Sequence, residues 1–168
     1  SPGNVDITME NFVYTEVEIA GGDNIVNIVD AKRGDISTGD GDDVITIAAK
    51  SNGPGWSNTF DVSTTGGTNN IEIIAAENGE TELNLQLGGD TTINLNGSFE
   101  SVEIAPNGFG DSSLTINSDL EGSDEWNDGD TDLSGFYSVT FNSSTFMVRN
   151  DGKLGDEMDS VIRGTDSD

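Results

Sequence analysis

The chain has 168 residues, of which 32 are acidic and 6 are basic, so its formal net charge is -26. This balance argues against nucleic acid or an anionic membrane surface as a partner, because both are bound through clustered lysine and arginine side chains. The sequence contains no cysteine and no histidine, which excludes disulfide bonds and the usual nucleophile–base pairs of catalysis. A fold with this much like charge repels itself unless cations neutralise it, which favours bound divalent metal or high salt.

Short apolar runs that follow Gly, Asp or Asn recur along the chain. The first set lies at 24–28, 43–47, 70–73, 92–95 and 113–116. The first apolar residues of these runs are 25, 44, 71, 93 and 114, which gives steps of 19, 27, 22 and 21 residues. A second set lies between them, at 35–37, 60–62, 83–87 and 102–104. Two strands in each repeat of about twenty residues is typical of a two-sheet β-roll or a parallel β-helix.

Apolar and polar residues alternate strictly within these runs, which indicates strands that have one face inward and one outward. Leu83, Leu85 and Leu87 share one face of their run, whereas Asn84 lies on the other. The longest step is explained by an insertion at 51–57. We therefore expect an all-β fold, a parallel β-solenoid with about two short strands per turn.

The pattern changes after residue 120. A dense acidic loop at 121–135 precedes two strand-like runs at 136–141 and 145–149. We expect these runs to form a hairpin that caps the stack, because the terminal edge of a solenoid needs to be covered. The sequence thus predicts a solenoid domain at 1–120. It predicts a second region at 121–168, made of the loop, the hairpin cap and the start of a following repeat.

One turn at 38–43 combines small residues with carboxylates and leads directly into a β-branched strand. Gly39, Gly41, Asp43 and Ile45 occupy the second, fourth, sixth and eighth positions of the nonapeptide Gly-Gly-x-Gly-x-Asp-x-apolar-x. The turn therefore resembles the repeat of RTX-type secreted proteins. In that family glycine carbonyls and the aspartate bind calcium, which accepts an all-oxygen ligand set in loose geometry.

The RTX resemblance implies a set of calcium ligands in this chain. They are Asp43, the carbonyls of Gly39 and Gly41, Asp40 or Asp42, and Asp23 and Asn24 of a neighbouring turn. The turns at 21–24, 66–70 and 88–90 look like degenerate copies, several of which have Asn or Thr in place of the key carboxylate. A glycine-rich turn without an ion is the alternative interpretation.

The acidic loop contains further candidate calcium ligands at Asp124, Asp128, Asp130 and Asp132. Asp124, Asp128 and Gly129 fit the first, fifth and sixth positions of an EF-hand loop. Trp126 stands where another ligand belongs, so this is not a proper EF-hand. A looser calcium loop and a solvated acidic loop both remain open.

The stretch Ser-Phe-Glu-Ser-Val-Glu-Ile at 98–104 resembles strands of bacterial surface-layer proteins and large RTX adhesins. Together with the calcium turn, it predicts a non-catalytic, calcium-stabilised structural module of an extracellular or cell-surface protein. Self-association or contact with neighbouring domains is expected, and membrane insertion is not, because no stretch is apolar enough to span a bilayer. One alternative is a glycan-binding module that uses Trp56 and Trp126. A polysaccharide lyase, epimerase or hydrolase on a β-helix is less favoured.

Overall fold

The structure is a computed structural model, and its strands form two sheets. It describes residues 3–51, 56–77, 81–97, 99–107, 112–118, 136–141, 144–148 and 154–157. All regular structure in these residues is β-strand. None of the described segments is a helix long and apolar enough to cross a membrane.

The larger sheet has nine strands and the smaller has five. In spatial order, the larger sheet consists of β1 (Asp6–Glu10), β3 (Ile25–Ala31), β5 (Val44–Ala49), β7 (Thr68–Ile74), β9 (Asp90–Asn96), β11 (Ser112–Ser118), β12 (Phe136–Phe141), β13 (Ser144–Val148) and β14 (Leu154–Glu157). The smaller sheet consists of β10 (Ser101–Pro106), β8 (Thr81–Leu87), β6 (Asn58–Ser63), β4 (Arg33–Asp40) and β2 (Thr15–Gly21). Pairing is parallel from β1 to β12 and throughout the smaller sheet, whereas β12, β13 and β14 pair antiparallel.

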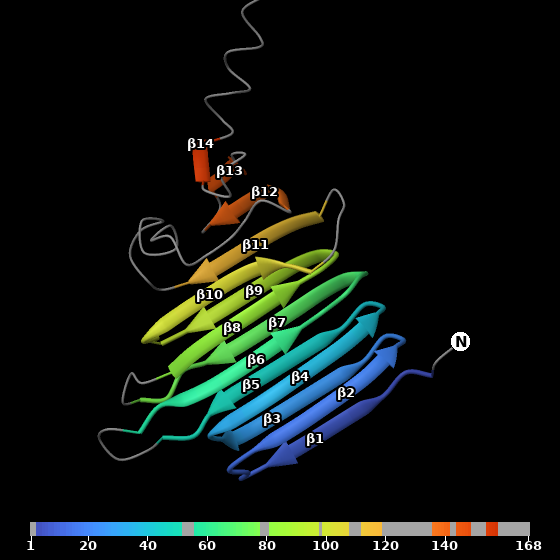
Figure 1. Cartoon of the computed structure of the whole chain (residues 1–168), viewed down its shortest axis with the longest axis vertical. Helices are drawn as coiled ribbons and strands as arrows, with labels where there is room; N and C mark the ends of the chain where they lie inside the picture. Colours follow the sequence, from blue (N-terminus) through green and yellow to red (C-terminus); the bar gives the residue numbers. More distant parts are fainter. Residues whose placement is uncertain are drawn as a thin grey trace, which may run out of the picture.

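The chain alternates between the two sheets, so that each odd-numbered strand from β1 to β9 is followed by a strand of the smaller sheet. One such pair of strands is called a rung below. Figure 1 shows the rungs stacked in chain order from the N-terminus. The predicted all-β parallel solenoid is confirmed, and its repeat is one rung.

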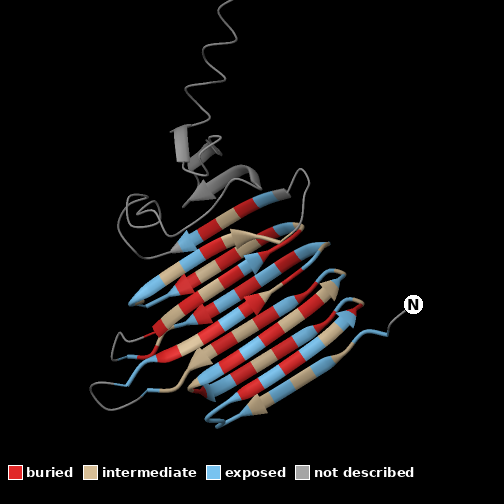
Figure 2. Cartoon of the chain, viewed as in Figure 1, coloured by how far each residue is buried: buried red, intermediate tan, exposed pale blue. Residues whose placement is uncertain are grey.

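The core lies inside the stack, where every second side chain of the central strands, such as β5, β7, β8 and β9, is buried (Figure 2). Ile28, Ile47, Ile73 and Leu95 occupy one register position in successive rungs and are 0–1% exposed. Each such aliphatic side chain contributes roughly 1.5–3 kcal/mol when it leaves water. The alternation of apolar and polar residues in the sequence is therefore the alternation between core and solvent.

The first rung, β1 with β2, was not predicted from the sequence. Its strands do alternate: Ile7 and Met9 are half-buried against the core, and Val17 is buried. The signal was weaker because no glycine-aspartate turn precedes β1. The predicted hairpin runs are strands that pair antiparallel, as β12 and β13. The acidic loop at 121–135, with Asp124, Asp128, Asp130 and Asp132, lies outside the described residues.

Candidate functional site

The turn between β4 and β5 holds two adjacent aspartates that face opposite ways. Asp43 is 0% exposed and points into the solenoid, whereas Asp42 is exposed. The two residues lead directly into β5, where consecutive side chains alternate between solvent and core. The carboxylates of Asp42 and Asp43 therefore lie on opposite sides of the backbone.

Asp43 belongs to a ladder of buried polar side chains inside the solenoid, which we call the inner ladder. Its members occupy one register position and are Asn24, Asp43, Asn69 and Thr91. Each of the first three accepts a hydrogen bond from a backbone amide of the rung before it. The amide of Val5 donates to Asn24 Oδ1 (3.1 Å), that of Asn24 to Asp43 Oδ1 (3.0 Å), and that of Asp43 to Asn69 Oδ1 (3.3 Å).

Asp42 belongs to a second ladder on the outside of the same turns, the outer ladder, which runs in the opposite direction. Here each side chain accepts from a backbone amide of the rung after it. The amide of Asp23 donates to Asn4 Oδ1 (3.1 Å), that of Asp42 to Asp23 Oδ1 (3.1 Å), and that of Thr68 to Asp42 Oδ1 (2.8 Å). The same contact recurs further on, where the amide of Ser113 donates to Asp90 Oδ1 (3.0 Å).

The second carboxylate oxygen of Asp43 is exceptional. Asp43 Oδ2 is buried and has no hydrogen-bond partner among the described residues. In the next rung, the side-chain amide of Asn69 donates to the carbonyls of Gly66 (3.1 Å) and Gly88 (3.0 Å). The carboxylate of Asp43 has no N–H group that could donate to carbonyls as Asn69 does. Its Oδ2 is therefore a buried acceptor without a donor in the described part of the chain. A buried oxygen without a partner costs free energy, and a bound cation would offset that cost.

The turn glycines are explained by close approach between rungs. A Cβ on Gly39 would lie 2.2 Å from the carbonyl oxygen of Ala20, and one on Gly41 would lie 2.3 Å from that of Gly22. A Cβ on Gly67 would lie 2.0 Å from the carbonyl oxygen of Gly41. The Gly-x-Gly spacing therefore has a packing cause that holds with or without an ion.

The structure brings some of the predicted calcium ligands together. Asn24 contacts Asp43 through two hydrogen bonds, from its backbone amide and from Nδ2 (2.8 Å), and Asp23 contacts the backbone of Asp42. Asp40 instead accepts a hydrogen bond from the hydroxyl of Thr65 (3.0 Å). Among the described residues, no group of three or more His, Cys, Asp or Glu side chains is placed to hold a metal ion. A calcium ion at this turn would thus rely on Asp43 and backbone carbonyls.

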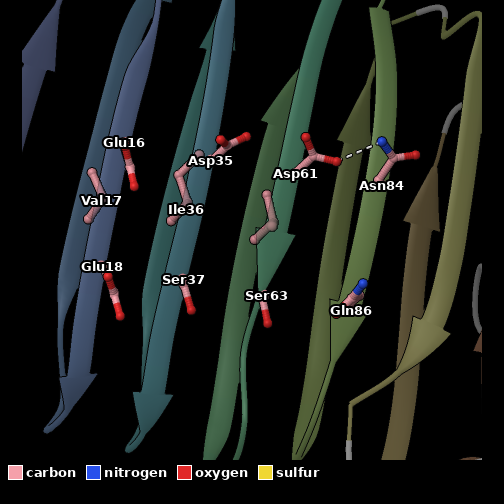
Figure 3. Close-up of a pocket in the computed structure, with 11 residues that line it drawn as sticks. Glu16, Val17, Glu18, Asp35, Ile36, Ser37, Asp61, Ser63, Asn84 and Gln86 are labelled. Carbon is pink, nitrogen blue, oxygen red and sulfur yellow. Dashed lines mark hydrogen bonds between the residues drawn. The ribbon is translucent and has the colours of Figure 1, made fainter.

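A shallow groove of about 240 Å³ lies on the outer face of the smaller sheet. Figure 3 shows its two rows of side chains, which cross β2, β4, β6 and β8. One row is Glu16, Asp35, Asp61 and Asn84; the other is Glu18, Ser37, Ser63 and Gln86. The carboxylates of Glu16, Asp35 and Asp61 lie on adjacent strands and repel one another. The side-chain amide of Asn84 offsets part of this repulsion by donating a hydrogen bond to Asp61 Oδ1 (2.7 Å). Sequence reasoning missed the groove, because the residues of each row lie in separate repeats.

Tyr14 lies beside this acidic row. Its hydroxyl donates a hydrogen bond to Asp35 Oδ2 (2.6 Å). This bond, followed by desolvation and the negative charges of Asp35, Glu16 and Asp61, raises the pKa of Tyr14 to about 12. The phenol therefore remains a hydrogen-bond donor at any physiological pH.

Trp56, one of the two tryptophans predicted for glycan contact, is 66% exposed. The ammonium group of Lys32 lies 5.6 Å from the centre of its ring, a cation–π distance. Trp126 lies outside the described residues.

Comparison with known proteins adds no relative. No protein-family model, curated protein or solved structure matches this chain.

Proposed function

We propose that this chain is a calcium-stabilised structural module of a secreted or cell-surface protein, part of a surface layer or an RTX-type adhesin, and that it is non-catalytic. The two ladders are the observation that carries this proposal. The polar side chains of the turns hold backbone amides of neighbouring rungs, in both directions, and so stiffen the stack instead of converging on a substrate. The resemblance of the turn at 38–43 and the strand that follows it to the RTX repeat supports the extracellular location.

The calcium part of the proposal depends on Asp43. A buried carboxylate oxygen without a partner is costly unless a positive charge neutralises it, and the whole chain carries a net charge of -26. Calcium accepts a ligand set made only of oxygens, as this turn offers. When bound, the ion would neutralise Asp43 and part of the surrounding negative charge.

Thermal unfolding with and without calcium tests the proposal. We expect the melting temperature of the chain to rise in calcium and to fall when a chelator is added. Magnesium, which demands tighter geometry and holds its water, should have a weaker effect. Circular dichroism and a melting temperature that are unchanged by the chelator would contradict the calcium part of the proposal.

A glycan-binding module is the second candidate, and the exposure of Trp56 favours it. A bare indole ring next to a lysine offers a stacking surface for a sugar, and the groove on the smaller sheet supplies carboxylates, amides and hydroxyls. A glycan array with the wild type and Trp56→Ala tests it. Silence on the array, or binding that survives the substitution, would count against it.

A polysaccharide-active enzyme is the weakest candidate. A lyase or epimerase needs a basic group near the sugar carboxylate, and no described residue that lines the groove is basic. A hydrolase would need a carboxylate pair, for which Asp35 and Asp61 on adjacent strands are one candidate. Release of reducing sugar from candidate polysaccharides that is lost in Asp61→Asn would favour an enzyme over the scaffold.

A further inference from the structure

A second buried oxygen without a partner flanks the same turn as Asp43. Thr38, near the end of β4, is 0% exposed, and its Oγ1 has no hydrogen-bond partner among the described residues. Asp43 Oδ2, just before β5, shares both properties. The third such atom, Thr15 Oγ1, lies at the other end of the strands, at the first residue of β2. Two of the three orphaned buried atoms in the described part of the chain therefore belong to one turn.

These two oxygens occupy the same positions as two hydrogen-bonded side chains of the next rung. The pairing of β4 with β6 and of β5 with β7, continued by one residue, places Thr38 beside Thr64 and Asp43 beside Asn69. The backbone supports the second match, because the amide of Asn70 donates to the carbonyl of Asp43 (2.8 Å). Four residues separate the members of each pair, so the two turns have the same length. The geometry of the second pair therefore indicates where the first pair points.

In that next rung, both side chains point at one atom. Thr64 Oγ1 donates to the carbonyl oxygen of Gly88 at 3.2 Å, and Asn69 Nδ2 donates to the same oxygen at 3.0 Å. Because the two turns are equivalent, Thr38 and Asp43 converge on a single point one rung earlier. The chemistry differs there, because Asp43 has an oxygen where Asn69 has a donating amide. A hydroxyl and a carboxylate thus converge inside the solenoid, and neither has satisfied its buried oxygen within the described residues.

We propose that Thr38 Oγ1 is a second side-chain ligand of the calcium ion at Asp43, and that this ion lies inside the solenoid between two rungs. The inference rests on the calcium role proposed for Asp43. It adds a ligand that the RTX resemblance does not supply, because glycine stands at the first position of that repeat. A threonine hydroxyl has two acceptor lone pairs, and calcium takes oxygen ligands in flexible geometry. A water molecule would satisfy both oxygens but would leave the charge of Asp43 buried, which is costly.

The charge around this point sets the expected affinity. Asp43 is the one buried acidic residue in the described part of the chain, so it supplies a single buried negative charge to a divalent ion. Asp40 and Asp42 are exposed on the same turn, and they offset the remaining positive charge through attraction that salt screens. Calcium affinity depends on the number of charged ligands. We therefore expect a dissociation constant of roughly 0.1–1 mM, the range of extracellular calcium modules.

The melting temperature of the full chain, measured against calcium concentration, tests the proposal and gives the dissociation constant. Thr38→Val removes the hydroxyl and keeps the shape, Thr38→Ser keeps the hydroxyl, and Thr64→Val is the matched control in the next rung. We expect Thr38→Val to weaken calcium binding about tenfold and Thr38→Ser to bind nearly as the wild type does. Thr64→Val should keep the calcium affinity of the wild type. Magnesium controls for general screening of the negative charge.

A wild type and a Thr38→Val variant with the same calcium dependence would overturn the proposal. Equal weakening by Thr38→Val and Thr64→Val would also overturn it, because it would indicate a general loosening of the turns. So would a Thr38→Val variant that melts below the wild type in chelator, since the hydroxyl would then have a partner without the ion. A wild type whose melting ignores calcium would remove the calcium proposal itself. A calcium response that Asp43→Asn abolishes and Thr38→Val retains would remove only the ligand role of Thr38.

Discussion

Asp42 and Asp43 are adjacent in the chain but hold rungs on opposite sides of their own. Asp42 accepts from the amide of Thr68 in the rung that follows, and Asp43 accepts from the amide of Asn24 in the rung that precedes. Because consecutive side chains of an extended segment point in opposite directions, one lies in solvent and the other in the core. One dipeptide thus joins three rungs.

Loss of the outer contact should be measurable at Asp42. Asp42→Ala removes the acceptor for the amide of Thr68 and should cost about 1 kcal/mol of unfolding free energy. Asp42→Asn keeps an oxygen in place and should cost less. Urea denaturation of both variants gives the comparison. Equal losses in the two variants would assign the effect to charge instead of to the ladder.

Close approach of the rungs makes Gly67 intolerant of substitution. Its φ of +77° opposes any side chain, and a Cβ here would lie 2.0 Å from the carbonyl oxygen of Gly41. Gly67→Ala should therefore destabilise the chain by more than about 2 kcal/mol. Gly3→Ala, whose Cβ would meet nothing within 4 Å, is the control and should be neutral. A stable Gly67→Ala would show that the turns stack less tightly than these distances require.

Two buried threonines in equivalent positions should respond differently to the same substitution. Thr38 Oγ1 has no partner among the described residues, whereas Thr64 Oγ1 donates to the carbonyl of Gly88 (3.2 Å). Thr38→Val should be neutral or stabilising, because it removes an unsatisfied hydroxyl, and Thr64→Val should cost about 1 kcal/mol or more. Thermal denaturation of both variants in chelator measures the two changes in stability. The reverse order would contradict the assigned contacts.

The Tyr14–Asp35 hydrogen bond predicts an alkaline titration. The pKa of Tyr14 is raised from 10.0 to about 12, so the folded state favours the neutral phenol. This contribution to stability is complete below pH 10 and is lost as the pH rises from 10 to 12. Ultraviolet absorbance should show one tyrosine that ionises late, and Asp35→Asn should lower its pKa. A wild type and an Asp35→Asn variant with the same titration curve would refute the contact.

The fold was predictable because its signal repeats. Alternating runs such as Leu83, Leu85 and Leu87 occur in every repeat, and their spacing of about twenty residues matches one rung. β1 and β2 escaped prediction because the residues before Asp6 lack the glycine-aspartate turn. The site was predictable in part: proximity of Asp43 to the turns at 21–24 and 66–70 follows from stacking and is observed.

Two features of the site could not be inferred from the sequence. The opposite directions of Asp42 and Asp43 depend on where the strand begins, and a shift of one residue would exchange them. The groove depends on the register between strands whose paired residues are 19 to 26 positions apart in the chain. Each row combines one residue from each repeat, and only the pairing of the strands shows that these residues are neighbours.

The most direct test of this account is the stability of Asp43→Asn with and without calcium, with Asp42→Asn as its exposed control. In chelator the variant should melt several degrees above the wild type, because an N–H donor replaces the unpaired oxygen. In the next rung the side-chain amide of Asn69 donates to two backbone carbonyls in this way. In calcium the wild type should gain stability and the variant should not, so the difference should shrink or reverse, while Asp42→Asn keeps the calcium response. A variant that melts below the wild type in chelator and still responds fully to calcium would contradict both the ladder and the ion at Asp43.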